Sequence, residues 1–224
     1  MNAVGGKPFG HRRNAVWRSL QFLLQNLFAF WFEYRARGFE NLPETGALLL
    51  MNHQSFLDPM LVGAPLQRPI SFLARDNLFR VPLIGWILRN TYVMPISREA
   101  AGTESLRESL RRIEAGYLIG VFPEGTRTAD GRLGILKPGF IALLRRTNCP
   151  IVPVGIAGAF EAYPRKALVP RPGKVRVVFG EPIAREEFTR FEKRGSEPAL
   201  LQLIRTRIEE CSAQAEQWRA NDMS

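Results

Sequence analysis

Short apolar runs alternate with amphipathic segments along the chain, and this alternation restricts the possible folds more than any other feature of the sequence. Each run has the length of a buried strand and is too short for a buried helix. The segments between the runs have helical spacing, clearest at residues 103–115 and 197–218. Strands separated by helices predict an α/β fold with a mixed, largely parallel sheet flanked by helices. The predicted strands are residues 47–51, 70–74, 92–96, 117–122, 151–154 and 174–179.

Further helices are predicted at residues 76–88 and 138–146, where Pro138 can begin a helix. The chain has 224 residues and contains no repeat and no long linker. This length suits one domain, which we place at residues 38–224. Residues 1–37 are predicted to form a basic tail followed by an amphipathic helix.

The N-terminal helix has an apolar stripe and aromatic residues flanked by arginines, a pattern that favours a helix lying in a membrane interface. The same stripe also fits a helix that packs on the protein core. Residues 20–32 would span only about 20 Å as a helix, whereas the hydrocarbon core of a bilayer is about 30 Å thick. A signal peptide is not expected, because residues 33–37 contain no small-residue cleavage site. The stripe consists of Val16, Leu20, Leu23, Leu24, Leu27, Phe28 and Trp31.

The chain is basic, with 31 Lys and Arg against 21 Asp and Glu and a net charge of +10. A basic surface attracts nucleic acid, anionic lipid head groups or phosphorylated molecules. We do not expect nucleic acid, because the sequence lacks zinc-finger spacing, an aromatic RNA-binding strand and a basic recognition helix. The two cysteines, Cys149 and Cys211, form neither a disulfide framework nor a metal cluster, and they suit a reducing, cytosolic setting. We interpret Cys149 as structural rather than as a nucleophile.

His53 and Asp58 follow the predicted strand at residues 47–51, at the end where open α/β sheets bind their ligands. On a continuous helix the two side chains would lie about 140° apart, so they can meet only if the chain turns between them. Pro59 favours Asp58 as a helix cap with Pro59 as the first helical residue. A carboxylate on one ring nitrogen would fix the tautomer of a histidine that acts as a base. Alternatively, His53 is an ordinary loop histidine and Asp58 only a cap.

A second polar segment, Phe122 to Thr128, follows the predicted strand at residues 117–122. Gly125 allows close approach of the backbone, and Arg127 can pair with a phosphate through two hydrogen bonds. Glu124 can hold that arginine or accept a hydrogen bond from a hydroxyl group. The alternative is a surface turn with a salt bridge.

Taken together, His53 with Asp58 and the later Phe122 to Arg127 segment resemble the glycerolipid acyltransferase family, particularly the lysophosphatidic acid acyltransferases. Ile96 to Arg98 and Ile151 to Gly155 are similar to two further segments of that family, in the same order. The resemblance runs from about Gly38 to Gly180, and it departs at Thr128, where the family more often has serine.

The resemblance implies that His53 is the general base and Asp58 its partner. It implies that the Glu124 segment binds the glycerol phosphate of the acceptor, and that two further cations contact the phosphate. The implied substrate-binding residues are Arg98, Glu124, Gly125, Thr126, Arg127 and Lys137.

The implied reaction moves a fatty acyl group from acyl-CoA or acyl carrier protein to the hydroxyl of 1-acylglycerol-3-phosphate. It would give phosphatidic acid for phospholipid biosynthesis and would need no metal or other cofactor. The partners would be the lysophospholipid acceptor, the thioester donor and a membrane surface. The protein would lie at the cytoplasmic face of the membrane, peripheral or monotopic. The alternatives are an acyltransferase for another lyso-lipid, such as lyso-ornithine lipid, or a non-catalytic lipid-binding protein.

Overall fold

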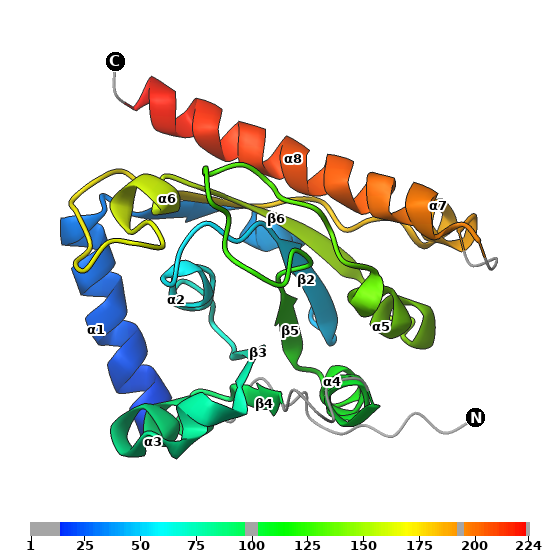
Figure 1. Ribbon diagram of the computed structural model, residues 1–224, viewed down its shortest axis with the longest axis horizontal. Helices are drawn as coiled ribbons and strands as arrows, with labels where there is room; N and C mark the ends of the chain where they lie inside the picture. The colour runs from blue at the N-terminus through cyan, green and yellow to red at the C-terminus, as the bar shows by residue number, and fades with distance from the viewer. Residues whose placement is uncertain (1–13, 97–102, 192–194, 223–224) are drawn as a thin grey trace.

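The computed structural model describes residues 14–96, 103–191 and 195–222. Within these residues one sheet has the strand order β1-β7-β6-β2-β5-β3-β4 (Figure 1). Only β6 and β7 pair in antiparallel fashion, and the other neighbouring strands are parallel. The expected mixed, largely parallel sheet is therefore confirmed. Its strands are β1 (Arg35–Arg37), β2 (Ala47–Met51), β3 (Ile70–Arg75), β4 (Met94–Ile96), β5 (Leu118–Val121), β6 (Ile151–Ala157) and β7 (Arg176–Phe179).

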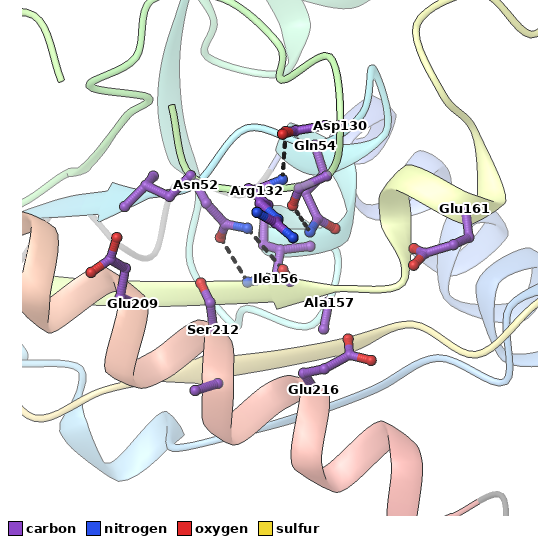
Figure 2. A pocket seen from close by; sticks show the side chains of 13 residues that line it. Asn52, Gln54, Asp130, Arg132, Ile156, Ala157, Glu161, Glu209, Ser212 and Glu216 are labelled. Carbon is purple, nitrogen blue, oxygen red and sulfur yellow. Dashed lines mark hydrogen bonds between the residues drawn. The ribbon is translucent and has the colours of Figure 1, made fainter. Parts of the chain in front are cut away.

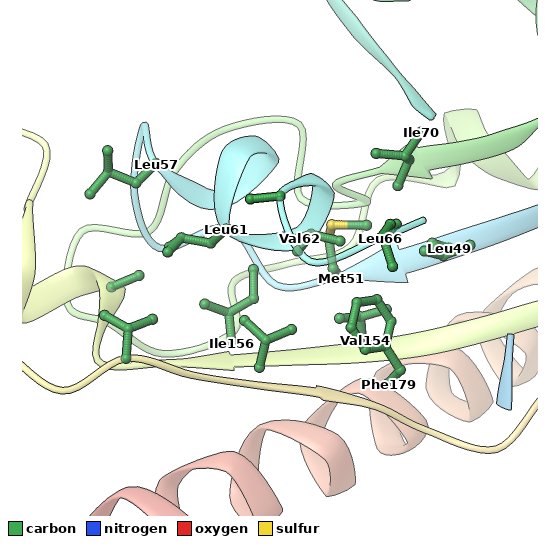
Figure 3. Packing of buried hydrophobic residues seen from close by; sticks show 14 of the residues in the cluster. Leu49, Met51, Leu57, Leu61, Val62, Leu66, Ile70, Val154, Ile156 and Phe179 are labelled. Carbon is green, nitrogen blue, oxygen red and sulfur yellow. The ribbon is translucent and has the colours of Figure 1, made fainter. Parts of the chain in front are cut away.

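Helices cover both faces of the sheet, and side chains of alternate residues in β2 point to opposite faces. Leu49 and Met51 pack with α1, α2 and α6, as Figure 3 shows for α2. Leu48 and Leu50 pack with α4, α5 and α8. The described helices are α1 (Ala15–Trp31), α2 (Asp58–Gly63), α3 (Pro82–Asn90), α4 (Thr103–Glu114), α5 (Ile141–Arg146), α6 (Ala159–Ala162), α7 (Arg185–Thr189) and α8 (Glu197–Asn221). Short 3₁₀ helices lie at Phe39–Asn41, Asp76–Arg80 and Pro138–Phe140.

The predicted helix at residues 76–88 is divided in the structure. A 3₁₀ helix ends at Arg80, and α3 begins at Pro82 after an extended Val81. The proline explains the break, because its ring disfavours helical backbone at the preceding residue. Three short elements, β1, α6 and α7, were not predicted, since a few residues carry no readable periodicity.

Helix α1 begins after Asn14, whose side-chain oxygen accepts a hydrogen bond from the backbone N–H of Trp17. The predicted apolar stripe is divided: Phe28 is buried against the core, whereas Leu23 and Leu27 are exposed. None of the described helices combines the length and the apolar character needed to cross a bilayer. The predicted basic tail, residues 1–13, lies outside the described residues.

Candidate active site

The segment after β2 carries His53 and is fixed to the neighbouring strand β6 by Asn52. The Asn52 amide donates to the carbonyl of Ile156 and accepts from its N–H, both at 2.8 Å. Asn52 is thus paired with β6 through its side chain in the manner of a strand residue. This contact holds the residue next to His53 at the carboxyl end of β2, where ligands bind in open α/β sheets.

His53 and Asp58 are in direct contact, with 2.7 Å between Nδ1 of the imidazole and Oδ2 of the carboxylate. The chain turns at residues 55–57, and α2 begins at Asp58, one residue earlier than predicted. The same Oδ2 accepts the backbone N–H of Ser55 at 2.7 Å. An ionised Asp58 carboxylate can only accept, so in this contact a neutral imidazole donates from Nδ1 and keeps the lone pair of Nε2.

The two partners differ sharply in exposure, with 18% of the His53 side chain and none of the Asp58 side chain accessible to solvent. Burial is the largest influence on Asp58 and raises its pKa, while the hydrogen bond and charge of His53 lower it. The pair therefore consists of a shielded carboxylate behind an imidazole that reaches the surface. This is the arrangement required for a base whose orientation is held by a second group.

Glu124 links the two polar segments that the sequence predicted to work together. Its buried carboxylate accepts the backbone N–H of His53 through Oε1 at 2.8 Å and that of Gly134 through Oε2 at 2.7 Å. A further backbone bond runs from Thr128 N–H to the His53 carbonyl at 2.8 Å. Burial raises the pKa of Glu124, and the two amide hydrogen bonds oppose that shift. Both oxygens are thus engaged with backbone, and Glu124 does not hold Arg127 as one alternative supposed.

An aromatic ring stacks on the face of the His53 imidazole, a contact that the sequence did not predict. The rings of His53 and Phe122 are stacked with centroids 3.9 Å apart, and the rings of Phe72 and Phe122 are stacked with centroids 5.8 Å apart. Gly120 makes room for this stack, because a β-carbon there would lie 2.3 Å from the Phe72 ring. No sequence signal identifies Phe122 as a partner of His53, since the contact joins two different strand ends.

The turn at Pro123 to Gly125 presents backbone and two cations at the surface. The Gly125 N–H donates to the Phe122 carbonyl at 2.9 Å, and Gly125 has φ of 65°, which favours glycine. Lys137 lies over this glycine: a β-carbon on Gly125 would be 3.3 Å from its Nζ. Arg127 is two residues further on, and neither cation is ion-paired with another described residue.

Of the two remaining predicted substrate-binding residues, the structure describes one. Thr126 is exposed beside Gly125 in the same turn. Arg98 lies outside the described residues, so the structure does not place it. The structure therefore brings His53, Asp58 and the Glu124 to Arg127 segment into one site, with Lys137 at its edge.

The Ser55 hydroxyl is engaged elsewhere, and the two cysteine thiols are shielded by burial. The Ser55 hydroxyl donates to the Tyr163 carbonyl at 2.8 Å, so it does not face His53 as a nucleophile would. Burial raises the pKa of the Cys149 thiol, and it raises that of Cys211 to about 11. Among the described residues, no three His, Cys, Asp or Glu side chains are arranged to hold a metal ion.

A pocket of about 540 Å³ lies between the residue 130–133 segment and α8 (Figure 2). Asn52 and Gln54 line it, but His53 does not. Four carboxylates line it, those of Asp130, Glu161, Glu209 and Glu216, against the single guanidinium of Arg132. An acidic lining repels a phosphate, so this pocket does not fit the anion site that the sequence predicts.

The chain resembles known acyltransferases in sequence. Residues 33–157 match a family model described as Acyltransferase. The chloroplastic 1-acyl-sn-glycerol-3-phosphate acyltransferase LPAT1 of Arabidopsis thaliana is 30% identical over 79% of this chain and 49% of its own length. The 1-acyl-sn-glycerol-3-phosphate acyltransferase of Bacillus subtilis is 27% identical over 80% of this chain and 87% of its own length. The chain thus spans about half the length of the Arabidopsis relative and most of the bacterial one.

A solved structure has the same fold. The crystal structure of the 1-acyl-sn-glycerophosphate (LPA) acyltransferase PlsC from Thermotoga maritima superimposes with a TM-score of 0.69. It is 24% identical in sequence, and the match covers 88% of this chain and 79% of the other. At this identity the likeness establishes the α/β architecture alone.

Proposed function

Because the chain belongs to the acyltransferase family, we propose that it transfers a fatty acyl group from an acyl thioester to the free hydroxyl of 1-acylglycerol-3-phosphate. The product is phosphatidic acid, the precursor used in phospholipid biosynthesis. The observation that carries this proposal is the 2.7 Å contact of His53 with the buried Asp58, which leaves Nε2 free to take a proton. The relatives named as 1-acyl-sn-glycerol-3-phosphate acyltransferases support the choice of acceptor.

In the proposed reaction, Nε2 of His53 removes the hydroxyl proton as the acceptor oxygen attacks the thioester carbonyl. The tetrahedral intermediate collapses, the carbon–sulfur bond breaks, and the thiolate leaves with the proton that His53 had taken. Asp58 stabilises the imidazolium between these two steps, since its carboxylate accepts a hydrogen bond from the Nδ1–H group. The donor is already an activated ester, so no acyl-enzyme is required and both substrates bind before transfer.

The acceptor phosphate binds at the turn after β5. Arg127 and Lys137 supply positive charge without a competing carboxylate among the described residues, and Gly125 exposes its backbone. Arg98 adds a third cation on the strength of the family resemblance. Glu124 acts mainly by holding the His53 and Gly134 backbones in place, because both of its oxygens are already hydrogen-bonded.

The acceptor is a membrane lipid, so the protein works at a bilayer surface, at its cytoplasmic face and as a peripheral or monotopic protein. The outer side chains of α1 support this location, since Phe22 and Phe30 are largely exposed. Acyl-CoA or acyl carrier protein is the donor. Both are anionic, which fits a chain of net charge +10.

Thiol release from long-chain acyl-CoA tests this function across a panel of lyso-lipid acceptors. We expect release that depends on 1-acylglycerol-3-phosphate and on His53, with less release for lyso-lipids that carry a larger head group or for lyso-ornithine lipid. Binding of the lyso-lipids without any release would indicate a lipid-binding protein. Release with lyso-ornithine lipid alone would keep the acyltransferase chemistry and change the acceptor.

A further inference from the structure

Helix α1 exposes apolar side chains on its outer side, although Trp17 and Phe28 are buried on its inner side. The Gln21 amide donates to the carbonyls of Ala64 and Leu66 at 2.8 and 2.6 Å, and the Gln25 amide donates to Ala64 at 2.8 Å. Two glutamines of α1 therefore contact the loop after α2. On its outer side, Phe30 is 87% exposed and Phe22 is 71% exposed. The outer face of a helix in water is normally polar, because exposed apolar surface costs free energy.

Helix α3 carries a second apolar surface beside the first. The two helices are in contact, and the Asn14 amide at the start of α1 donates to the Asn90 carbonyl at the end of α3 at 2.8 Å. Both lie along the same edge of the molecule in Figure 1. On α3, Leu83 is 69% exposed and Trp86 is 51% exposed. Exposed apolar side chains gathered on neighbouring elements mark an interaction site.

We propose that α1 and α3 together form one bilayer-docking surface, which contacts the head-group region of an anionic membrane. We call this the two-helix surface and define it by Phe22, Leu23, Phe30, Leu83, Ile84 and Trp86. The proposal rests on the proposed function, because the acceptor of that reaction is a membrane lipid. It extends that function by assigning a docking role to α3, which lies between two strands of the catalytic domain.

Charge identifies the occupant as an anionic lipid surface. Neither α1 nor α3 contains an aspartate or a glutamate, and each contains one arginine, Arg18 and Arg89. Arginines beside aromatic residues are typical of helices that lie in a membrane interface, and tryptophan is enriched at that depth. Two polar side chains at the end of α3 also suit an apolar medium, since Asn90 and the following residue Thr91 both donate to backbone carbonyls of α3.

Co-sedimentation with vesicles tests the proposal directly. The full chain is mixed with phosphatidylcholine vesicles that contain phosphatidylglycerol, and the partition coefficient is compared with that of a Leu83→Glu/Trp86→Glu variant. We expect partitioning to fall at least about tenfold, because the variant no longer transfers two apolar side chains from water into the bilayer. Both positions are exposed, so the thermal midpoint should stay close to that of the wild type.

A charge-matched control separates this surface from the overall charge of the protein. The Ala142→Glu/Gln202→Glu variant adds the same two negative charges on α5 and α8, which pack on the opposite face of the sheet from α1. It should partition within about twofold of the wild type, because surface charge acts within roughly one Debye length. Equal losses in both double variants would overturn the proposal, as would an unchanged Leu83→Glu/Trp86→Glu variant.

A second copy of the chain is the rival occupant of an exposed apolar surface. Sedimentation equilibrium without lipid should show a monomer for the wild type. A dimer that the Leu83→Glu/Trp86→Glu substitutions dissociate would contradict the lipid assignment. Vesicle binding needs no turnover, so a chain that docks through this surface but releases no thiol contradicts the proposed function alone.

Discussion

The imidazole of His53 lies against the ring of Phe122, with ring centroids 3.9 Å apart and planes inclined by 21°. Asp58 holds the edge of the same imidazole at Nδ1. The ring is thus oriented in two ways, by a hydrogen bond in its plane and by an aromatic surface on its face. A base that is held in both ways has few alternative positions. Less conformational entropy is therefore lost when the transition state is reached.

Replacing Phe122 should therefore slow the reaction without abolishing it. We expect Phe122→Ala to lower kcat about 3- to 10-fold, because aromatic pairs contribute about 0.5–1.5 kcal/mol beyond their buried area. Phe122→Tyr retains the ring and should retain most of kcat. Steady-state kinetics with varied acceptor measures this. Equal loss of kcat in both variants, or a change only in KM, would contradict a positioning role.

Removal of the base or of its partner should stop turnover in a folded protein. We expect His53→Ala to lower kcat about 10²- to 10⁴-fold, the usual contribution of a general base. Asp58→Asn should cause a loss of similar size, because an amide can donate to Nδ1 and favour the wrong tautomer. Circular dichroism checks the fold. A folded His53→Ala protein with wild-type activity would falsify the assignment.

The two cations at the turn should act on the acceptor rather than on the chemical step. We expect Arg127→Ala and Lys137→Ala each to raise the KM for 1-acylglycerol-3-phosphate about 10-fold or more, since a hydrogen bond to a charged group contributes about 1.5–3 kcal/mol. The KM for acyl-CoA is the internal control and should change much less. If both constants rise together, these residues bind the donor instead.

Glu124 should contribute to stability as well as to activity. Glu124→Ala leaves the His53 and Gly134 N–H groups without their acceptor, and we expect the free energy of unfolding to fall by about 2 kcal/mol or more. Glu124→Gln retains one acceptor oxygen and should lose less. Denaturant titration measures both. A Glu124→Ala protein of unchanged stability with a higher acceptor KM would instead support direct contact with the substrate.

Acid should remove a stabilising contact at the end of α8. The Arg176 guanidinium donates to Asp222 at 2.9 and 2.5 Å, and these bonds lower the pKa of the Asp222 carboxyl. A lowered pKa means that the contact stabilises the fold above the unfolded pKa of about 3.9 and is lost as pH falls through the folded value. Asp222→Asn should therefore lower the melting temperature at pH 7. The difference from the wild type should shrink toward pH 2, and a constant difference would contradict this cause.

The sequence predicted the buried strands and the long helices well. A strand that is buried on both faces is continuously apolar, and a long amphipathic helix repeats its apolar spacing over several turns. Residues 47–51 form β2 as predicted, and the predicted helix at residues 197–218 corresponds to α8. It predicted helix boundaries less well next to proline. At Pro82 the single helix expected at residues 76–88 is a 3₁₀ helix followed by α3. The antiparallel pairing of β6 with β7 was not readable, since strand direction depends on partners far apart in the chain.

For the site, the sequence by itself determined which groups are present: one histidine with a carboxylate nearby, and a glycine turn with a cation. These depend on residue identity and on local backbone rules. Only the tertiary structure decided how they meet. Glu124 supports the His53 backbone, Phe122 supports its ring, and α1 turns its glutamines inward. Such contacts join residues from different strands and helices, and local sequence patterns carry no information about distances between them.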